Sequence, residues 1–134
     1  MHDYGLFQAI ESRFEQDEFL GTKLQGLFSQ TPLSVAFPHA LLRIQDVVTD
    51  SFRPPKKLSV DFALVLFSRY RGFKEVHRLM SRVGEILDAS PLTVKSKDSD
   101  FTGNAVLRLQ KQQIKLQKDE LTREGIMEYQ AWLR

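Results

Sequence analysis

The sequence contains no cysteine among its 134 residues. The fold therefore depends on no disulfide bond, and the chain offers no thiol nucleophile and no thiolate ligand for a metal. Long apolar runs are also missing, because no stretch approaches the roughly 20 residues that a membrane-spanning helix needs. The first residues have neither the basic start nor the apolar stretch of a signal peptide. We expect a soluble protein of a reducing compartment with no membrane partner.

Motifs that carry catalysis or bind metals are equally scarce. The three histidines, His2, His39 and His77, do not form a pair with the spacing of a zinc-binding helix. No phosphate-binding glycine loop, dinucleotide-binding glycine motif or nucleophile elbow occurs. Asp98 and Asp100 lack the downstream glycine and glutamate of a calcium loop. We therefore expect no enzyme activity, no cofactor and no metal, and an enzyme with a weakly marked pocket ranks last among the functions considered.

The strongest signal is a strand followed directly by a helix. Residues 58–67 alternate with period 2, and the second face turns apolar toward its end, which predicts a strand buried on both sides there. Gly72 provides a point of chain reversal. From residue 73 the apolar residues follow helical spacing, which predicts a helix over residues 73–87 that packs on the strand. The apolar stripe of this helix consists of Val76, Leu79, Met80, Val83, Ile86 and Leu87.

The remaining chain predicts one more helix, three more main strands and two short extended pieces. A helix with Asp3 as N-cap opens the chain, and residues 23–38 form an irregular connection with one short strand at residues 33–35. A strand over residues 40–48 would place Asp46 on the face of Leu42, Ile44 and Val48. Residues 92–94 are a short extended piece. Strands follow over residues 104–117 and 122–133, and a change of phase in the first predicts a β-bulge within residues 110–113.

These elements predict one α+β domain spanning residues 1–134. Its mostly antiparallel sheet has about four main strands, helices pack on one face, and a central amphipathic helix joins two hairpins. The length suits a single domain with one core.

A basic central region leaves a nucleic-acid-binding module open as the alternative function. Its cations are opposed there only by Asp50, Asp61 and Glu75, and a solvated basic face is the favoured explanation for them. The cations are Arg53, Lys56, Lys57, Arg69, Arg71, Lys74, Arg78 and Arg82. The N-terminal region is acidic instead, so a head-to-tail ring would bring unlike surfaces together.

Two runs resemble the tail-completion, or head–tail joining, family of long-tailed phages and gene transfer agents. Residues 62–80 contain a strand ending in Ser68-Arg69, then Gly72 and an amphipathic helix, and residues 83–94 continue into Pro91-Leu92-Thr93. The closing hairpin, residues 116–133, and the strand after Pro38 are similar to the family as well. The resemblance covers residues 38–133. The sequence departs from the family pattern at Pro54-Pro55 and in the Gln- and Lys-rich residues 110–115.

The resemblance implies a structural virion protein assembled in the bacterial host cytoplasm and located in the tail or neck. Such proteins form a ring, usually of six copies, that caps the tail tube and docks to a head-completion (stopper) protein, while DNA passes through the lumen without sequence-specific binding. The stiff hairpin arm over residues 49–57 and the Arg69 turn are the expected contact elements. The interface residues we predict are Phe52, Arg53, Pro54, Pro55, Lys56, Lys57, Arg69 and Arg71.

Overall fold

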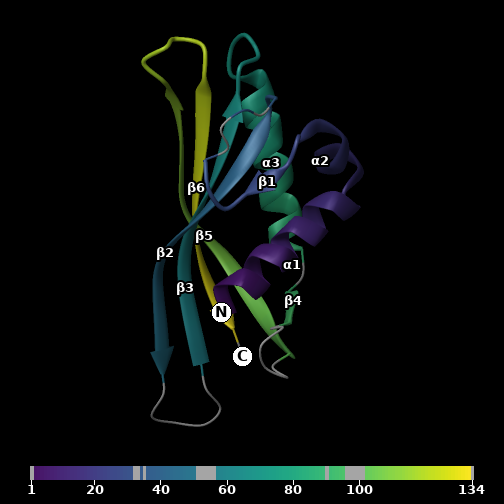
Figure 1. Cartoon of the computed structure of the whole chain (residues 1–134), viewed down its shortest axis with the longest axis vertical. Coiled ribbons are helices and arrows are strands. Elements are labelled where there is room, and N and C mark those ends of the chain that lie inside the picture. Colours follow the sequence, from purple (N-terminus) through teal and green to yellow (C-terminus); the bar gives the residue numbers. More distant parts are fainter. Residues whose placement is uncertain are drawn as a thin grey trace.

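The computed structural model describes residues 2–31, 34, 36–50, 57–89, 91–95 and 102–133. The helices are α1 (His2–Gln16), α2 (Glu18–Lys23) and α3 (Lys74–Asp88). The strands are β1 (Leu27–Phe28), β2 (His39–Asp50), β3 (Lys57–Ser68), β4 (Leu92–Lys95), β5 (Thr102–Leu116) and β6 (Arg123–Leu133). Figure 1 shows long strands crossing the whole molecule, with the helices gathered on one side of them.

The described strands form one sheet in the order β1-β2-β3-β6-β5-β4. All neighbours are antiparallel except β1 and β2, which are parallel. The α+β class is confirmed, but the sheet has six strands rather than about four. The two additional strands are short: β4 is the predicted extended piece, and β1 was missed. The short strand predicted at residues 33–35 lies partly outside the described residues, and Ser34 between them is in a bend.

The packing of α3 on β3 forms the centre of the core, as the periodicity of the sequence predicts. Phe62, Leu64 and Leu66 on one face of β3 are fully buried, and Ala63 and Val65 on the other face are buried as well. All six apolar stripe residues of α3 are buried. At about 1.5–3 kcal/mol for each large apolar side chain removed from water, this contact is a major source of stability.

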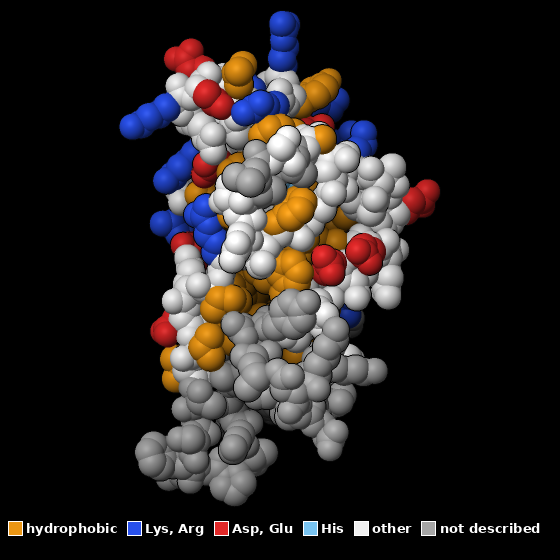
Figure 2. Space-filling view, in the orientation of Figure 1, with side chains coloured by type: hydrophobic (Ala, Val, Ile, Leu, Met, Phe, Trp, Pro, Cys, Tyr) orange, Lys and Arg blue, Asp and Glu red, His pale blue; other side chains and the backbone are white. Residues whose placement is uncertain are grey.

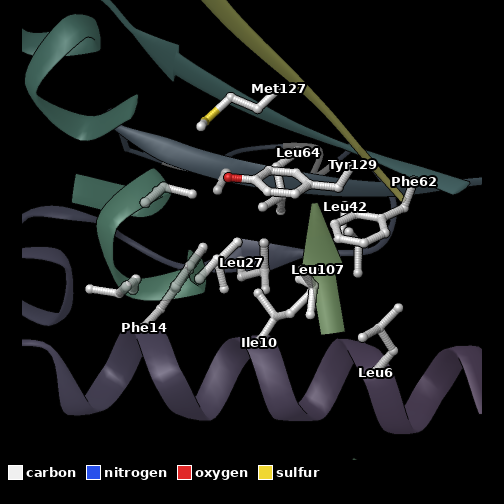
Figure 3. Packing of buried hydrophobic residues seen from close by; sticks show 14 of the residues in the cluster. Leu6, Ile10, Phe14, Leu27, Leu42, Phe62, Leu64, Leu107, Met127 and Tyr129 are labelled. Carbon is white, nitrogen blue, oxygen red and sulfur yellow. The ribbon is translucent and has the colours of Figure 1, made fainter. Parts of the chain in front are cut away.

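The helix α1 lies across the same face of the sheet as α3. Figure 3 shows Leu6, Ile10 and Phe14 pointing from α1 toward Leu107 and Leu42 of the sheet. The helix begins at His2, so Asp3 lies within it and is not the predicted N-cap. Polar contacts also connect the helices, because Arg13 Nη1 donates to the Ile86 carbonyl at 3.1 Å.

Two β-bulges bend the sheet near its middle. The first leaves Gln110 unpaired between Leu109 and Lys111, which confirms the bulge predicted within residues 110–113. The second lies between Ile44 and Asp46 in β2. It reverses the phase of the strand, so Asp46 does not share a face with Leu42 and Ile44, and that part of the prediction is wrong.

Both bulges flank one row of directly paired residues: Ile44, Phe62, Tyr129 and Leu109. Within this row the rings of Phe62 and Tyr129 stack with centroids 5.4 Å apart. Bulges increase the right-handed twist of a sheet, and the strands in Figure 1 turn sharply at this level. The β2–β3 hairpin therefore extends below this row and the β5–β6 hairpin extends above it.

Candidate assembly surfaces

The predicted interface residues do not form one surface. Phe52, Arg53, Pro54, Pro55 and Lys56 lie outside the described residues. Lys57 begins β3 and pairs with Asp50, at the lower end of the β2–β3 hairpin in Figure 1. Arg69 and Arg71 follow the other end of the same strand, so the structure separates them from Lys57 by the length of β3.

The turn around Arg69 joins the turn between β5 and β6 into one continuous surface. We call residues 69–73 and 117–122 together the turn surface. Arg69 Nε donates to Thr122 Oγ1 at 3.0 Å, and its guanidinium lies 3.9 Å from Asp119 Oδ2. Two turns that are about 50 residues apart in the sequence are thereby held side by side at the upper end of the sheet (Figure 1).

Asp119 organises the β5–β6 turn. Its Oδ1 accepts hydrogen bonds from the backbone N–H groups of Leu121 and Thr122, and its Oδ2 accepts one from the Thr122 hydroxyl at 2.7 Å. These bonds favour the ionised carboxylate. The backbone hydrogen bonds, the one from Thr122 first, lower the pKa of Asp119 to about 2.

The turn between β3 and α3 is shaped by its own polar contacts. The Ser68 hydroxyl donates to Glu75 Oε1 at 2.7 Å and accepts a bond from the Tyr70 backbone N–H. Gly72 adopts a φ of 78°, which L side chains rarely take, so the predicted chain reversal at this glycine is confirmed.

The turn surface exposes apolar side chains among cations. Tyr70 and Leu121 are each 59% exposed, and Phe73 is also exposed. Arg123, at the start of β6, lies over the Phe73 ring at 5.7 Å. Figure 2 shows Lys and Arg side chains gathered at this end of the molecule with apolar side chains between them. Such a combination is typical of protein-contact surfaces, where aromatic residues and arginine are enriched.

An aromatic cluster supports the turn surface from below. The His39 ring contacts Phe28, Phe37 and Phe67, with the Phe67 centroid 5.0 Å away, and Arg69 lies 4.3 Å over Phe37. Burial lowers the pKa of His39, so the ring stays neutral near pH 7. No sequence motif indicated this cluster, since its aromatic residues come from two strands and a connection.

Three of the described cations of the basic central region make contacts within the chain. Arg82 Nε donates to Asp17 Oδ1 at 2.9 Å, and Arg82 also pairs with Glu85. Arg78 lies 5.4 Å over the Phe19 ring. These contacts engage Arg69, Arg78 and Arg82 within the chain, and they weaken the case for a nucleic-acid-binding module.

The sheet face opposite the helices, which we call the uncovered face, carries balanced charge. Alternation and register place four cations and four anions on it among the described side chains. They are Arg43, Arg108, Lys111 and Lys115, and Asp46, Asp61, Glu124 and Glu128. Lys111 is directly opposite Glu128, and Lys115 is opposite Glu124. Asp46, in contrast, is directly opposite Asp61.

Two long strands have partly unpaired edges. Among the described residues, β1 pairs only with Ala40 and Leu41 of β2, and β4 pairs only with residues 102–105 of β5. Residues 43–48 of β2 are all exposed, with Val47 at 44% and Val48 at 57%. Beside the β5 edge, a groove of about 480 Å³ lies between α3 and β5, lined among others by Met80, Gln112 and Ile114.

Within the described parts of the chain, no group of His, Cys, Asp and Glu could hold a metal ion. The helices described here are also too short or too polar to cross a bilayer.

Comparison with solved structures gives a neighbour of known origin. The chain superposes on a chain from a structure described as the virion of a native gene transfer agent particle, with a TM-score of 0.76. The superposition covers 96% of this chain and 93% of that chain, at 18% sequence identity. No protein-family model matches the sequence, and no curated protein matches it either. The chain therefore has the fold of a gene transfer agent virion chain.

Proposed function

We propose that this chain is a structural, non-catalytic subunit of a phage-like virion, and specifically a tail terminator or head–tail connector. In this proposal a ring of six copies caps the tail tube and docks it to the head-completion protein. DNA passes through the lumen without sequence-specific binding, and the ring is assembled in the bacterial cytoplasm.

One observation carries the proposal. The chain shares its fold with a virion chain over nearly the full length of both chains, so the likeness is not limited to a common core motif. The resemblance of residues 38–133 to the tail-completion family points to the same class of protein. Two further features agree with a subunit that assembles: an exposed apolar and basic turn surface, and long strands with unpaired edges.

Capping of tail tubes tests the proposal directly. Purified protein is added to polymerising tail-tube protein, and tube length and tube ends are followed by electron microscopy. We expect tubes to stop growing and to carry a ring at one end. Mass photometry of the protein alone and with tubes gives the number of copies, and six copies of the 15.5 kDa chain correspond to about 93 kDa. Tubes that grow at an unchanged rate without rings would contradict the proposal.

Deletion of residues 52–55 tests the predicted hairpin arm. We expect a variant that folds and melts cooperatively but does not cap tubes, because the deletion removes the stiff contact element between β2 and β3. Normal capping by this variant would exclude the arm as a contact element.

Binding of duplex DNA across a salt series tests the alternative function. A nucleic-acid-binding module would show affinity that falls steeply with salt, since each neutralised phosphate releases counterions. A flat salt response would remove that alternative.

A further inference from the structure

The two strand edges that lack a partner among the described residues lie on opposite sides of the sheet and run in opposite directions. Because β2, β3, β6 and β5 alternate in direction, β2 and β5 are antiparallel to each other. Placing a second copy beside the first brings β5 of one copy next to β2 of the other, and the antiparallel alternation continues across the boundary. Unpaired backbone N–H and C=O groups on such edges are ready to accept another strand.

The positions of β1 and β4 limit how the two edges can meet. Within one copy, Val47 and Leu107 lie in the same row of the sheet. Val47 pairs with Val60, Val60 pairs with Ala131, and Ala131 pairs with Leu107. Side-by-side copies without a shift would bring β1 of one copy against the upper part of β5 in the next. A shift that pairs the end of β2, residues 46–50, with the end of β5, residues 111–115, avoids both short strands. The paired segments of this shifted arrangement both follow a bulge in the sequence: residues 46–50 follow the bulge of β2, and residues 111–115 follow the bulge of β5.

Chemistry selects one register within that range. In the free chain Asp46 lies opposite Asp61 on the uncovered face, and two like charges directly across a sheet are destabilising. A cation from a neighbouring copy beside Asp46 would relieve this repulsion. β5 carries Arg108, Lys111 and Lys115 but no acidic residue. If Asp46 faces Lys115, then Val47 faces Ile114 on the helix side of the sheet, so an acid meets a base and two apolar residues meet each other.

We propose that β2 of one copy pairs in antiparallel fashion with β5 of the next copy, with Asp46 opposite Lys115 and Val47 opposite Ile114. This interface rests on the ring in the proposed function, and it specifies how that ring is built. The contact is head-to-tail, since each copy offers two different edges.

The register implies a tilt that a closed ring can adopt. Within one copy, Ile114 lies in the same row of the sheet as Ala40, which is six rows away from Val47. Pairing Val47 of one copy with Ile114 of the next therefore shifts the two copies by six rows along the strands. Six rows are about 20 Å along the strands, and four long strands are about 19 Å wide. The strands would therefore tilt by about 45° from the ring axis, at the upper end of the range found in closed barrels. In this ring we place the helices outside and the uncovered face toward the lumen.

Cysteine cross-linking tests the pairing without background, because the chain contains no cysteine. The double variant Val47→Cys/Ile114→Cys, oxidised mildly at high protein concentration, should give a ladder of cross-linked multimers on a non-reducing gel. The matched control Val47→Cys/Gln113→Cys moves one thiol to the opposite sheet face and should give at least tenfold less product. The two single variants mixed together should give cross-linked dimers, and either single variant alone should give none, as a head-to-tail contact requires.

Two results would overturn the pairing. Absence of a ladder from Val47→Cys/Ile114→Cys would do so, whether or not the unsubstituted protein forms rings. Efficient dimers from Val47→Cys alone would also do so, since they would mean that β2 pairs with itself. A ladder from a protein that leaves tail tubes uncapped would instead overturn the proposed function and leave the strand pairing intact.

Discussion

Gly125 marks the closest approach between β6 and α3. A Cβ atom at this position would lie 2.6 Å from Met80 Sδ and 2.9 Å from Val76 Cγ2. Met80 can move, but the β-branched Val76 is stiff and fully buried. The absence of a side chain at Gly125 is therefore a packing requirement of the helix–sheet contact.

A pair of glycine variants separates this requirement from a general effect of added methyl groups. Gly125→Ala should lower the free energy of unfolding by about 1–3 kcal/mol through overpacking. The Cβ atom added by Gly84→Ala, within α3, would meet only Met127 Cε, at 3.9 Å. This variant should raise the free energy of unfolding by about 0.5–1 kcal/mol, because alanine has a higher helix propensity than glycine. Urea denaturation of both variants measures the two effects, and equal destabilisation would contradict the close contact at Gly125.

Asp119 makes the stability of the β5–β6 turn depend on pH. Its pKa is lowered to about 2 in the folded chain by the backbone hydrogen bonds from Thr122 and Leu121. A carboxylate with a lowered pKa stabilises the fold above its unfolded pKa near 4, and this contribution is lost as the pH falls toward 2. The stability difference between the wild type and Asp119→Ala should therefore be largest above pH 4 and shrink between pH 4 and 2. Glu120→Ala, in the same turn, is the matched control.

At the scale of elements, the contact of α3 with β3 decides whether the chain folds. Val83 is fully buried in the centre of the α3 stripe. Val83→Asp places a charge between helix and sheet, where the cost exceeds several kcal/mol, and should abolish cooperative thermal unfolding. Ser81→Asp, at an exposed position of the same helix, should melt cooperatively. A cooperative melt for Val83→Asp would show that this contact is less important than its burial indicates.

The elements with long, clear periods were predictable, and the short ones were not. The strand and helix around Gly72 follow from two uninterrupted periodicities, and the change of phase between Leu109 and Ile114 located the β5 bulge. The pattern around Asp46 contained the same kind of signal. Only one polar residue breaks the alternation there, so the sequence alone does not distinguish a bulge from a single polar exception. A two-residue strand such as β1 leaves no periodicity at all, since its pairing with β2 is a tertiary contact.

The candidate site was predictable only in part. Arg69 lies on an exposed turn, as expected, but its partners Asp119 and Thr122 are distant in the sequence. The separation of Lys57 from Arg69 could have been anticipated, because a twelve-residue strand spans about 40 Å. The free strand edges could not be predicted, since they depend on where β1 and β4 stop.

At the scale of the whole molecule, the sheet has a helical side and an uncovered side. Arg13, Asp17 and Arg82 hold α1, α2 and α3 together on the helical side. Nothing comparable covers the other side among the described residues, where charged side chains of both signs meet solvent. In the ring proposed above, this difference between the two sides decides which residues face the DNA.

The equal numbers of cations and anions among the described side chains of that face have, in the proposed ring, a consequence for transport. Along the described side chains a duplex would find no continuous positive track on which to shed its condensed ions, because Lys111 lies opposite Glu128 and Lys115 lies opposite Glu124. The passage should neither grip the nucleic acid nor push it away, so the rate of genome exit should change little between dilute and concentrated buffers.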